Sequence, residues 1–216
     1  MPLHRWTLDN GLPGMAERRP QLEPGSVGFV VRTGSRDDAA QINGVSHFLE
    51  HMLFKGTEAL SGHDIDAAFD RLGAEYNAFT GYEYTGYYAR VLPEDLAEAF
   101  EVLADMMRPA LRQEDFDVEK NVILEEIALY EDRPGAVLQR EANRAFYGAH
   151  PLSQEILGSA ECIRALTREQ MADYHAARYG APNLTLAAVG QFEPDGSKQP
   201  GQDRRAARRR TPPQRE

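Results

Sequence analysis

Apolar residues recur three and four positions apart along much of the chain, which is the spacing of one face of a helix. This pattern predicts amphipathic helices over residues 45–54, 63–72, 94–108, 113–133, 136–147 and 168–178. Stretches rich in Val, Thr and aromatic residues predict strands instead. They lie at 25–33, at 184–190, and as an antiparallel pair around Gly81 between residues 75 and 92.

Capping residues set the expected ends of these helices. Ser46, Ser61 and Thr167 stand where an N-cap is expected, and Gly56 and Gly73 stand where the first two helices should end. The order of elements is a strand, two helices, two strands, several helices and a final strand. This order indicates an α+β protein built in layers rather than a doubly wound parallel sheet.

Composition separates a folded body from a basic tail. The chain has 216 residues, of which 42% are hydrophobic, and this excludes a wholly disordered protein. Residues 193–216 are dominated by Pro and Arg and have almost no apolar side chain, which predicts a disordered tail. The single cysteine, Cys162, excludes an internal disulfide.

Charge and hydropathy indicate which classes of binding partner the chain favours. The net charge is −10, and residues 1–196 carry 17 basic against 32 acidic side chains. This balance disfavours nucleic acid and favours cationic partners. The start lacks the pattern of a signal peptide, and no apolar segment approaches the ~18 residues needed to cross a bilayer. A cytoplasmic protein without membrane insertion is therefore expected.

The segment with the strongest chemical signal is the first predicted helix. His47 and His51 are four positions apart and share one helical face, so both imidazoles can point at one metal ion. Glu50 lies at the margin of that face, where its carboxylate can deprotonate a water molecule. The pattern His-x-x-Glu-His belongs to the zinc peptidase signatures, and a chain of this composition contains it by chance roughly 0.03 times. The alternative is a pair of surface histidines, but the apolar residues around them favour a packed helix.

A catalytic zinc site needs three protein ligands and one open position. The third ligand must come from elsewhere in the chain, and carboxylates are the only abundant candidates. The helix predicted over 113–133 carries Glu119, Glu125 and Glu126 beside an apolar face. Their spacing alone does not choose among them.

Three segments in order resemble the pitrilysin and insulinase family of zinc peptidases, the inverzincins. They read GVSHFLEHMLFKGT, LGAEYNAFTGYEYTGYYARV and EKNVILEEIALYED. The likeness runs from about residue 5 to 192 and is greatest to the branch that contains the β subunit of the mitochondrial processing peptidase. It implies that His47, His51 and Glu126 bind Zn²⁺, that Glu50 is the general base, and that Glu119 assists the site.

The same resemblance implies a fold, a substrate and a reaction. The fold would be two-layered, with a mixed or antiparallel sheet covered by helices on one face. An extended or unfolded polypeptide would bind as an added strand beside Asn77, Ala78, Phe79 and Thr80. The function would be that of a metalloendopeptidase cutting extended peptides or presequences. The alternative is a non-catalytic subunit that assembles with a processing peptidase and presents substrate. A purely structural zinc site is disfavoured because it would need four protein ligands.

The family is built as a clamshell of two halves, and this chain resembles the N-terminal half. The expected division is a zinc-binding peptidase domain over 1–166, the start of a following homologous domain over 167–192, and the tail over 193–216. On this division, the strand at 184–190 would lack its neighbours in a sheet. A second-half subunit or a homo-oligomer would then complete the enzyme, and the chain alone would bind zinc but cleave poorly.

Overall fold

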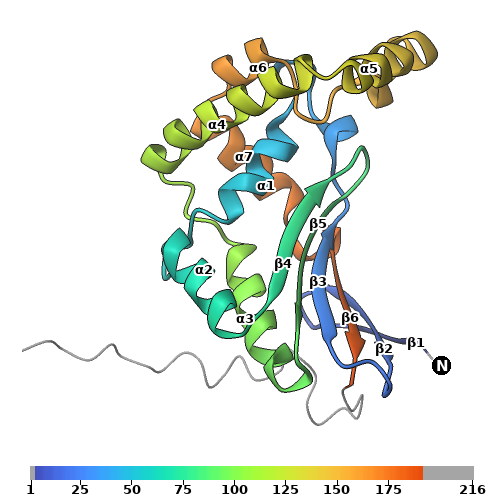
Figure 1. Cartoon of the computed structure of the whole chain (residues 1–216), viewed down its shortest axis with the longest axis vertical. Coiled ribbons are helices and arrows are strands. Elements are labelled where there is room, and N and C mark those ends of the chain that lie inside the picture. The colour runs from blue at the N-terminus through green and yellow to red at the C-terminus, as the bar shows by residue number, and fades with distance from the viewer. Residues whose placement is uncertain (1–2, 192–216) are drawn as a thin grey trace, which may run out of the picture.

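Helices cover one face of an open six-stranded sheet in the computed structural model, which describes residues 3–191 (Figure 1). The strands run in the order β1-β2-β6-β3-β5-β4, with β2 and β6 parallel and the other neighbours antiparallel. Their bounds are β1 (Leu3–Thr7), β2 (Pro13–Arg18), β3 (Gly25–Val31), β4 (Glu75–Thr80), β5 (Thr85–Val91) and β6 (Leu184–Gly190). The predicted α+β fold, with a mixed sheet and helices on one face, is confirmed.

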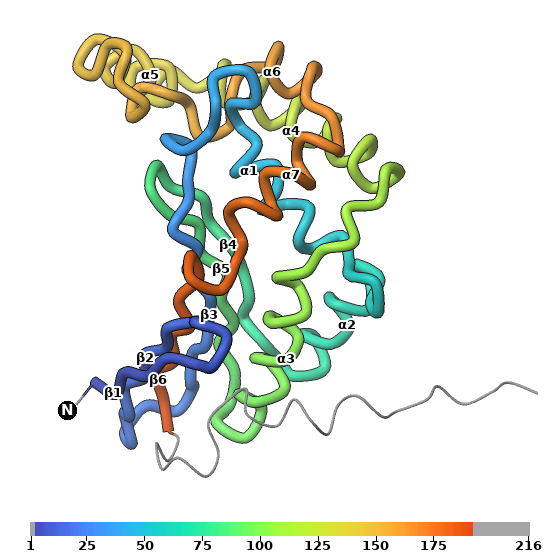
Figure 2. Tube along the Cα trace, turned by 180° about the vertical axis from the view of Figure 1, so that it is seen from behind, coloured from blue at the N-terminus to red at the C-terminus, as the bar shows by residue number. Residues whose placement is uncertain are grey.

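The helices lie on the same side of the sheet in both views of the backbone, except that α5 projects from one end of the molecule (Figures 1 and 2). None of the residues of α5 is buried. The helices are α1 (Val45–Leu53), α2 (Gly62–Arg71), α3 (Leu96–Met106), α4 (Gln113–Glu131), α5 (Pro134–Tyr147), α6 (Ala160–Ala165) and α7 (Arg168–Arg178). No helix among residues 3–191 combines the length and the apolarity that crossing a bilayer requires.

Every predicted helix and strand is present, and among the strands and α-helices of residues 3–191 three were not predicted, namely β1, β2 and α6. Strands β1 and β2 pair with each other at one edge of the sheet, and α6 has only six residues. Strand β1 buries no side chain fully, and its apolar residues Leu3 and Trp6 are three positions apart, so its sequence shows no two-residue period of apolar residues.

Strand β6 lies inside the sheet, between β2 and β3. The expectation that this strand would lack sheet neighbours is therefore wrong. Helix α7, which precedes it, buries Met171 and Tyr174 in the same core as Leu186 of β6. Residues 167–191 thus pack with the residues before them. The tail predicted over 193–216 lies outside the described residues.

The core fills the space between the sheet and the helices. Alternate residues of β3 point to the helix side, so that Phe29 is 4% exposed, and Tyr87 of β5 is 1% exposed. Phe48 of α1, Phe69 of α2 and Met106 of α3 meet this layer and are fully buried. The core therefore fixes α1 against the strands on one side.

The first turn of α1 is not capped as predicted. Helix α1 begins at Val45, its N-cap is Gly44, and Ser46 is a buried residue inside the helix. Gly44 has a φ of +95°, and its N–H donates to Oδ2 of Asp38 at 2.9 Å. Ser46 cannot be the N-cap because the chain enters the helix through a left-handed residue, a conformation that favours glycine. The predicted caps Ser61 and Thr167 are confirmed.

Replacing Gly44 by Ala is expected to lower the free energy of unfolding by about 3 kcal/mol. The positive φ is strained for alanine, and the new Cβ would lie 2.4 Å from the carbonyl oxygen of Leu157. Urea denaturation measures the change. Gly135→Ala in α5 is the control, because no atom lies within 4 Å of the added Cβ there and φ is not positive. Equal stability of the two variants would contradict this account of Gly44.

Candidate metal centre

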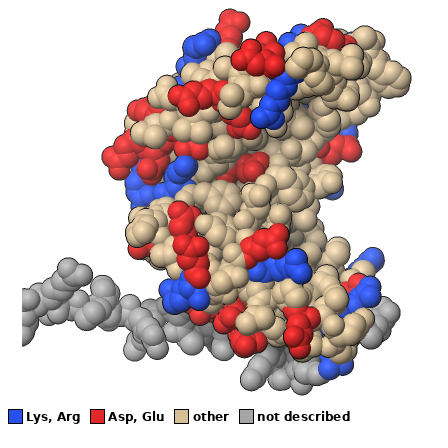
Figure 3. All heavy atoms as spheres, in the orientation of Figure 1, with Lys and Arg blue, Asp and Glu red and all other residues tan. Residues whose placement is uncertain are grey.

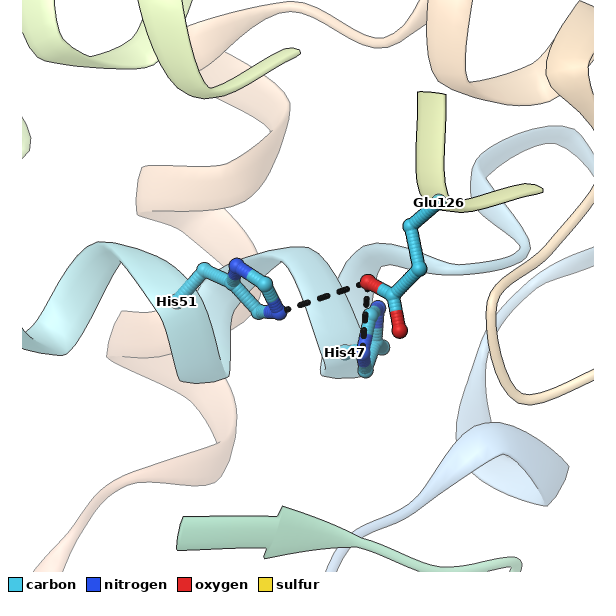
Figure 4. Close-up of side chains that lie close together, drawn as sticks. All are labelled: His47, His51 and Glu126. Carbon is cyan, nitrogen blue, oxygen red and sulfur yellow. Dashed lines mark ion pairs between the residues drawn. The ribbon is translucent and has the colours of Figure 1, made fainter. Parts of the chain in front are cut away.

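Two histidines of α1 and one glutamate of α4 converge on a single point (Figure 4). Nε2 of His47 and Nε2 of His51 each lie 3.7 Å from Oε2 of Glu126. The three ligand atoms all lie within 4.8 Å of one another. Two ligands of a tetrahedral zinc ion stand about 3.3–3.6 Å apart, so small side-chain shifts would bring these atoms to bonding distance. Two imidazole nitrogens and a carboxylate oxygen are also a donor set that suits zinc.

The packing of α1 explains why these side chains meet. Phe48 is stacked on Phe116 of α4, with ring centroids 4.8 Å apart and an interplanar angle of 16°. Both rings are at most 1% exposed. This contact holds α1 across α4 and leaves His47 and His51 facing Glu126. The apolar residues between the histidines therefore position the metal-binding face.

Burial prepares His47 to bind a cation. His47 is only 8% exposed, and burial together with the nearby His51 lowers the pKa of its imidazole from 6.5 to about 3. The imidazole is therefore neutral at physiological pH, which is the form that binds a metal. Its Nδ1 is buried and has no hydrogen-bond partner among residues 3–191.

Glu119 contacts His51 through the ring nitrogen that faces away from the metal site, Nδ1. Its Oε1 lies 2.8 Å from Nδ1 of His51, and its Oε2 lies 2.7 Å from Nζ of Lys55. Burial raises the pKa of Glu119, but the contacts with His51 and Lys55 outweigh it, so the pKa is lowered. The carboxylate is thus ionised and directs Nε2 of His51 toward Glu126. Lys55 was not predicted to take part; its position four residues after His51, the spacing of one helical face, is the signal that indicates it.

Glu50 lies beside the ligands without joining them. It is 9% exposed, and the hydroxyl of Thr80 donates to its Oε2 at 2.5 Å. Burial raises its pKa above the usual value and the charge of Glu126 adds to this, while the Thr80 hydrogen bond and His51 oppose it. A carboxylate with a raised pKa, next to a metal site, suits proton transfer near neutral pH.

The four residues predicted to bind substrate lie on β4, the last strand of the sheet. Thr80 contacts Glu50, so it connects this strand to the metal centre. Phe79 is 44% exposed and packs edge-to-face on Tyr84. The N–H of Ala78 donates to the side chain of Asn77 at 2.8 Å. The outer edge of β4 pairs with no strand among the described residues.

Negative charge gathers over α4 (Figure 3). The helix has seven Asp and Glu residues and a single Lys. This field attracts cations to the face that carries Glu126.

The chain is similar to known proteins of one peptidase family. The family described as Insulinase (Peptidase family M16) matches residues 15–160. An uncharacterized zinc protease of Mycobacterium tuberculosis is 41% identical over 193 residues, which are 89% of this chain and 44% of that protein. The chain thus spans less than half the length of this curated relative.

Solved structures share the fold. A putative M16-like peptidase from Alicyclobacillus acidocaldarius superposes with a TM-score of 0.82 at 31% identity, over 89% of this chain and 46% of that one. A peptidase M16 inactive domain from Pseudomonas fluorescens superposes with the same TM-score at 22% identity, over 89% of this chain and 47% of the other. The fold alone therefore does not decide whether a member is active.

Proposed function

Because the chain belongs to the insulinase family of peptidases (peptidase family M16), we propose that it forms the metal-binding part of a zinc-dependent endopeptidase. The observation that carries this proposal is the convergence of His47, His51 and Glu126, with the Glu50 carboxylate beside them. Three protein ligands leave a fourth position of a tetrahedral zinc ion open, as in catalytic rather than structural sites.

Each side chain has a distinct part in the proposed reaction. A zinc ion held by His47, His51 and Glu126 would acidify water and polarise the scissile carbonyl. Glu50 accepts the proton of the attacking water and returns it to the leaving amine. Glu119 keeps the His51 ring oriented through Nδ1. Thr80 fixes the Glu50 carboxylate through a hydrogen bond.

The outer edge of β4 is the proposed substrate site. Hydrogen bonding alternates along an antiparallel strand, and the N–H of Gly81, just after β4, donates to the carbonyl of Tyr84, just before β5. The backbone groups of Ala78 and Thr80 therefore face the free edge, where an extended peptide can pair with them once the N–H of Ala78 leaves the side chain of Asn77. Its scissile bond would lie near Thr80, next to Glu50. The acidic α4 favours peptides with basic residues.

A second half is proposed to complete the enzyme. The chain covers 44% of its mycobacterial relative and 46% of the Alicyclobacillus peptidase, so more than half of each lies beyond the matched region. We expect residues 3–191 to bind zinc and to cleave peptides slowly. Full turnover would need the other half, as a separate subunit or in an oligomer.

The alternative is a non-catalytic subunit that keeps the fold for assembly and substrate presentation. The Pseudomonas fluorescens domain, which is named inactive, has the same fold. The fold is therefore compatible with this alternative too. The complete set of His47, Glu50, His51 and Glu126 favours the catalytic function.

Metal analysis and a cleavage assay test the proposal together. After chelator treatment and dialysis against Zn²⁺, the chain is expected to hold one zinc ion per molecule. At that occupancy, it is expected to cleave an extended fluorogenic peptide slowly, with no cleavage before zinc is added. A chain that binds no zinc would contradict the metal site. Turnover as fast as that of a two-half enzyme of the family would contradict the need for a second half.

A further inference from the structure

A buried polar cluster lies at the start of α1, next to the turn that carries His47. It consists of Asp38, Ser46, Tyr174 and Thr33, none of which is more than 7% exposed. Thr33 and Asp38 lie in the segment after β3, Ser46 lies on α1, and Tyr174 lies on α7. The cluster therefore joins three parts of the fold at the helix that carries both histidines.

Asp38 supplies the cap that α1 lacks. Gly44 is the N-cap and has no side chain to accept the first N–H groups. Oδ2 of Asp38 accepts from the N–H of Gly44 at 2.9 Å and from the N–H of Ser46 at 3.5 Å, and Oδ1 accepts from the hydroxyl of Ser46 at 2.6 Å. The negative charge also lies at the positive end of the helix dipole.

Tyr174 ties α7 to the same turn. Its hydroxyl lies 2.7 Å from Oγ of Ser46, 2.9 Å from Oγ1 of Thr33, and 3.0 Å from Oδ1 of Asp38. Ser46 immediately precedes His47 in the sequence. One phenol oxygen thus contacts Thr33 of the segment after β3, the capping residue Asp38, and the residue next to a ligand.

The carboxylate depends on these donors. Burial raises the pKa of Asp38 from 3.8 to about 6, against the lowering effect of its hydrogen bonds. It is therefore mostly ionised at pH 7 while it is 3% exposed. A buried charge that loses a donor is costly, so the first turn of α1 would shift to recover the contact.

We propose that Tyr174 and Asp38 are positioning residues of the metal centre, which fix the first turn of α1 and thereby the place of His47 relative to Glu126. The proposal rests on the zinc site proposed above. Metal ligands must stand within about 0.2 Å of their proper distances, so a small shift of this turn weakens binding. On this proposal, helix α7 acts on the site through the contacts of Tyr174 with Ser46 and Asp38.

Two tyrosine variants test it, each removing one hydroxyl and keeping the ring. Tyr174→Phe removes the contact with α1. Tyr179→Phe is the matched control, because Tyr179 is also 7% exposed, follows α7 directly, and bonds through its hydroxyl to Tyr87 at 2.9 Å. Tyr174→Phe is expected to raise the zinc Kd about 10-fold or more, and Tyr179→Phe less than 2-fold. Competition with a chromophoric chelator measures both.

Cobalt provides a readout that a general loss of stability would not change. At saturating Co²⁺, the visible absorption of Tyr174→Phe should differ in shape from the wild type, and that of Tyr179→Phe should match it. Ser46→Ala removes another hydroxyl of the cluster and serves if Tyr174→Phe does not fold. Equal zinc Kd values and equal spectra for the cluster and control variants would overturn the proposal. Absence of metal binding by the wild type would instead overturn the zinc site itself.

Discussion

Glu50→Gln is expected to lower the rate of peptide cleavage by about 10²–10⁴-fold while zinc binding stays within a few-fold of the wild type. Glutamine keeps the size of the side chain and its hydrogen bond with Thr80 but cannot accept a proton from water. Because Glu50 is beside the ligand atoms and not among them, the metal should remain. The combination of retained zinc and lost cleavage is specific to a general base.

The measurement compares kcat/KM and zinc content in the assembly that gives measurable turnover. Glu125→Gln is the matched control, because Glu125 neighbours the ligand Glu126 on α4 but is exposed. It removes one negative charge at a similar place and should leave the rate within a few-fold. Cleavage that survives Glu50→Gln would exclude Glu50 as the base. A wild type that binds zinc but never cleaves, even with a second half, would favour the non-catalytic subunit.

A side effect of Glu50→Gln separates chemistry from folding. Burial raises the pKa of Glu50, so its charge is costly in the folded state. The neutral variant should therefore be at least as stable as the wild type. A loss of activity together with a higher unfolding temperature cannot come from a misfolded chain.

The local part of the site could be predicted from the sequence. His47 and His51 follow from the helical period alone, since residues four apart share a face. The family resemblance, and not spacing, selected Glu126 over Glu119 and Glu125. Tyr174 was not predicted to take part, because it lies 136 positions from Asp38 and no local pattern reports such a contact.

In the sheet too, pairing between strands close in sequence could be predicted, and pairing between distant strands could not. The β4–β5 hairpin was predicted because its strands are adjacent in the sequence and alternate clearly. The place of β6 was not, because its partners β2 and β3 lie more than 150 positions earlier. A strand at 184–190 is visible in the sequence, but its neighbours depend on how the whole chain packs.

His51→Ala is expected to raise the zinc Kd by more than about 100-fold. This is a larger effect than the loss of a residue that only hydrogen-bonds to a metal ligand would have. The change removes one of three ligand atoms and also leaves Glu119 without its partner at Nδ1. His175→Ala is the control, because this half-buried histidine of α7 hydrogen-bonds to the carbonyl of Met107 and packs on Tyr179 rather than on a proposed ligand. It should leave zinc affinity within about 2-fold of the wild type.

Thermal unfolding with and without zinc reports the same loss independently of activity. A ligand at 100 times its Kd stabilises the folded state by about 2.7 kcal/mol. At the zinc concentration that gives this gain for the wild type, His51→Ala would bind only about half-maximally at a Kd 100-fold higher, and the gain would fall to about 0.4 kcal/mol. His175→Ala should keep the full shift, whatever its own stability without metal. A zinc-dependent shift in His51→Ala as large as in the wild type would mean that the ion binds elsewhere, and the assignment of His47, His51 and Glu126 would then fail.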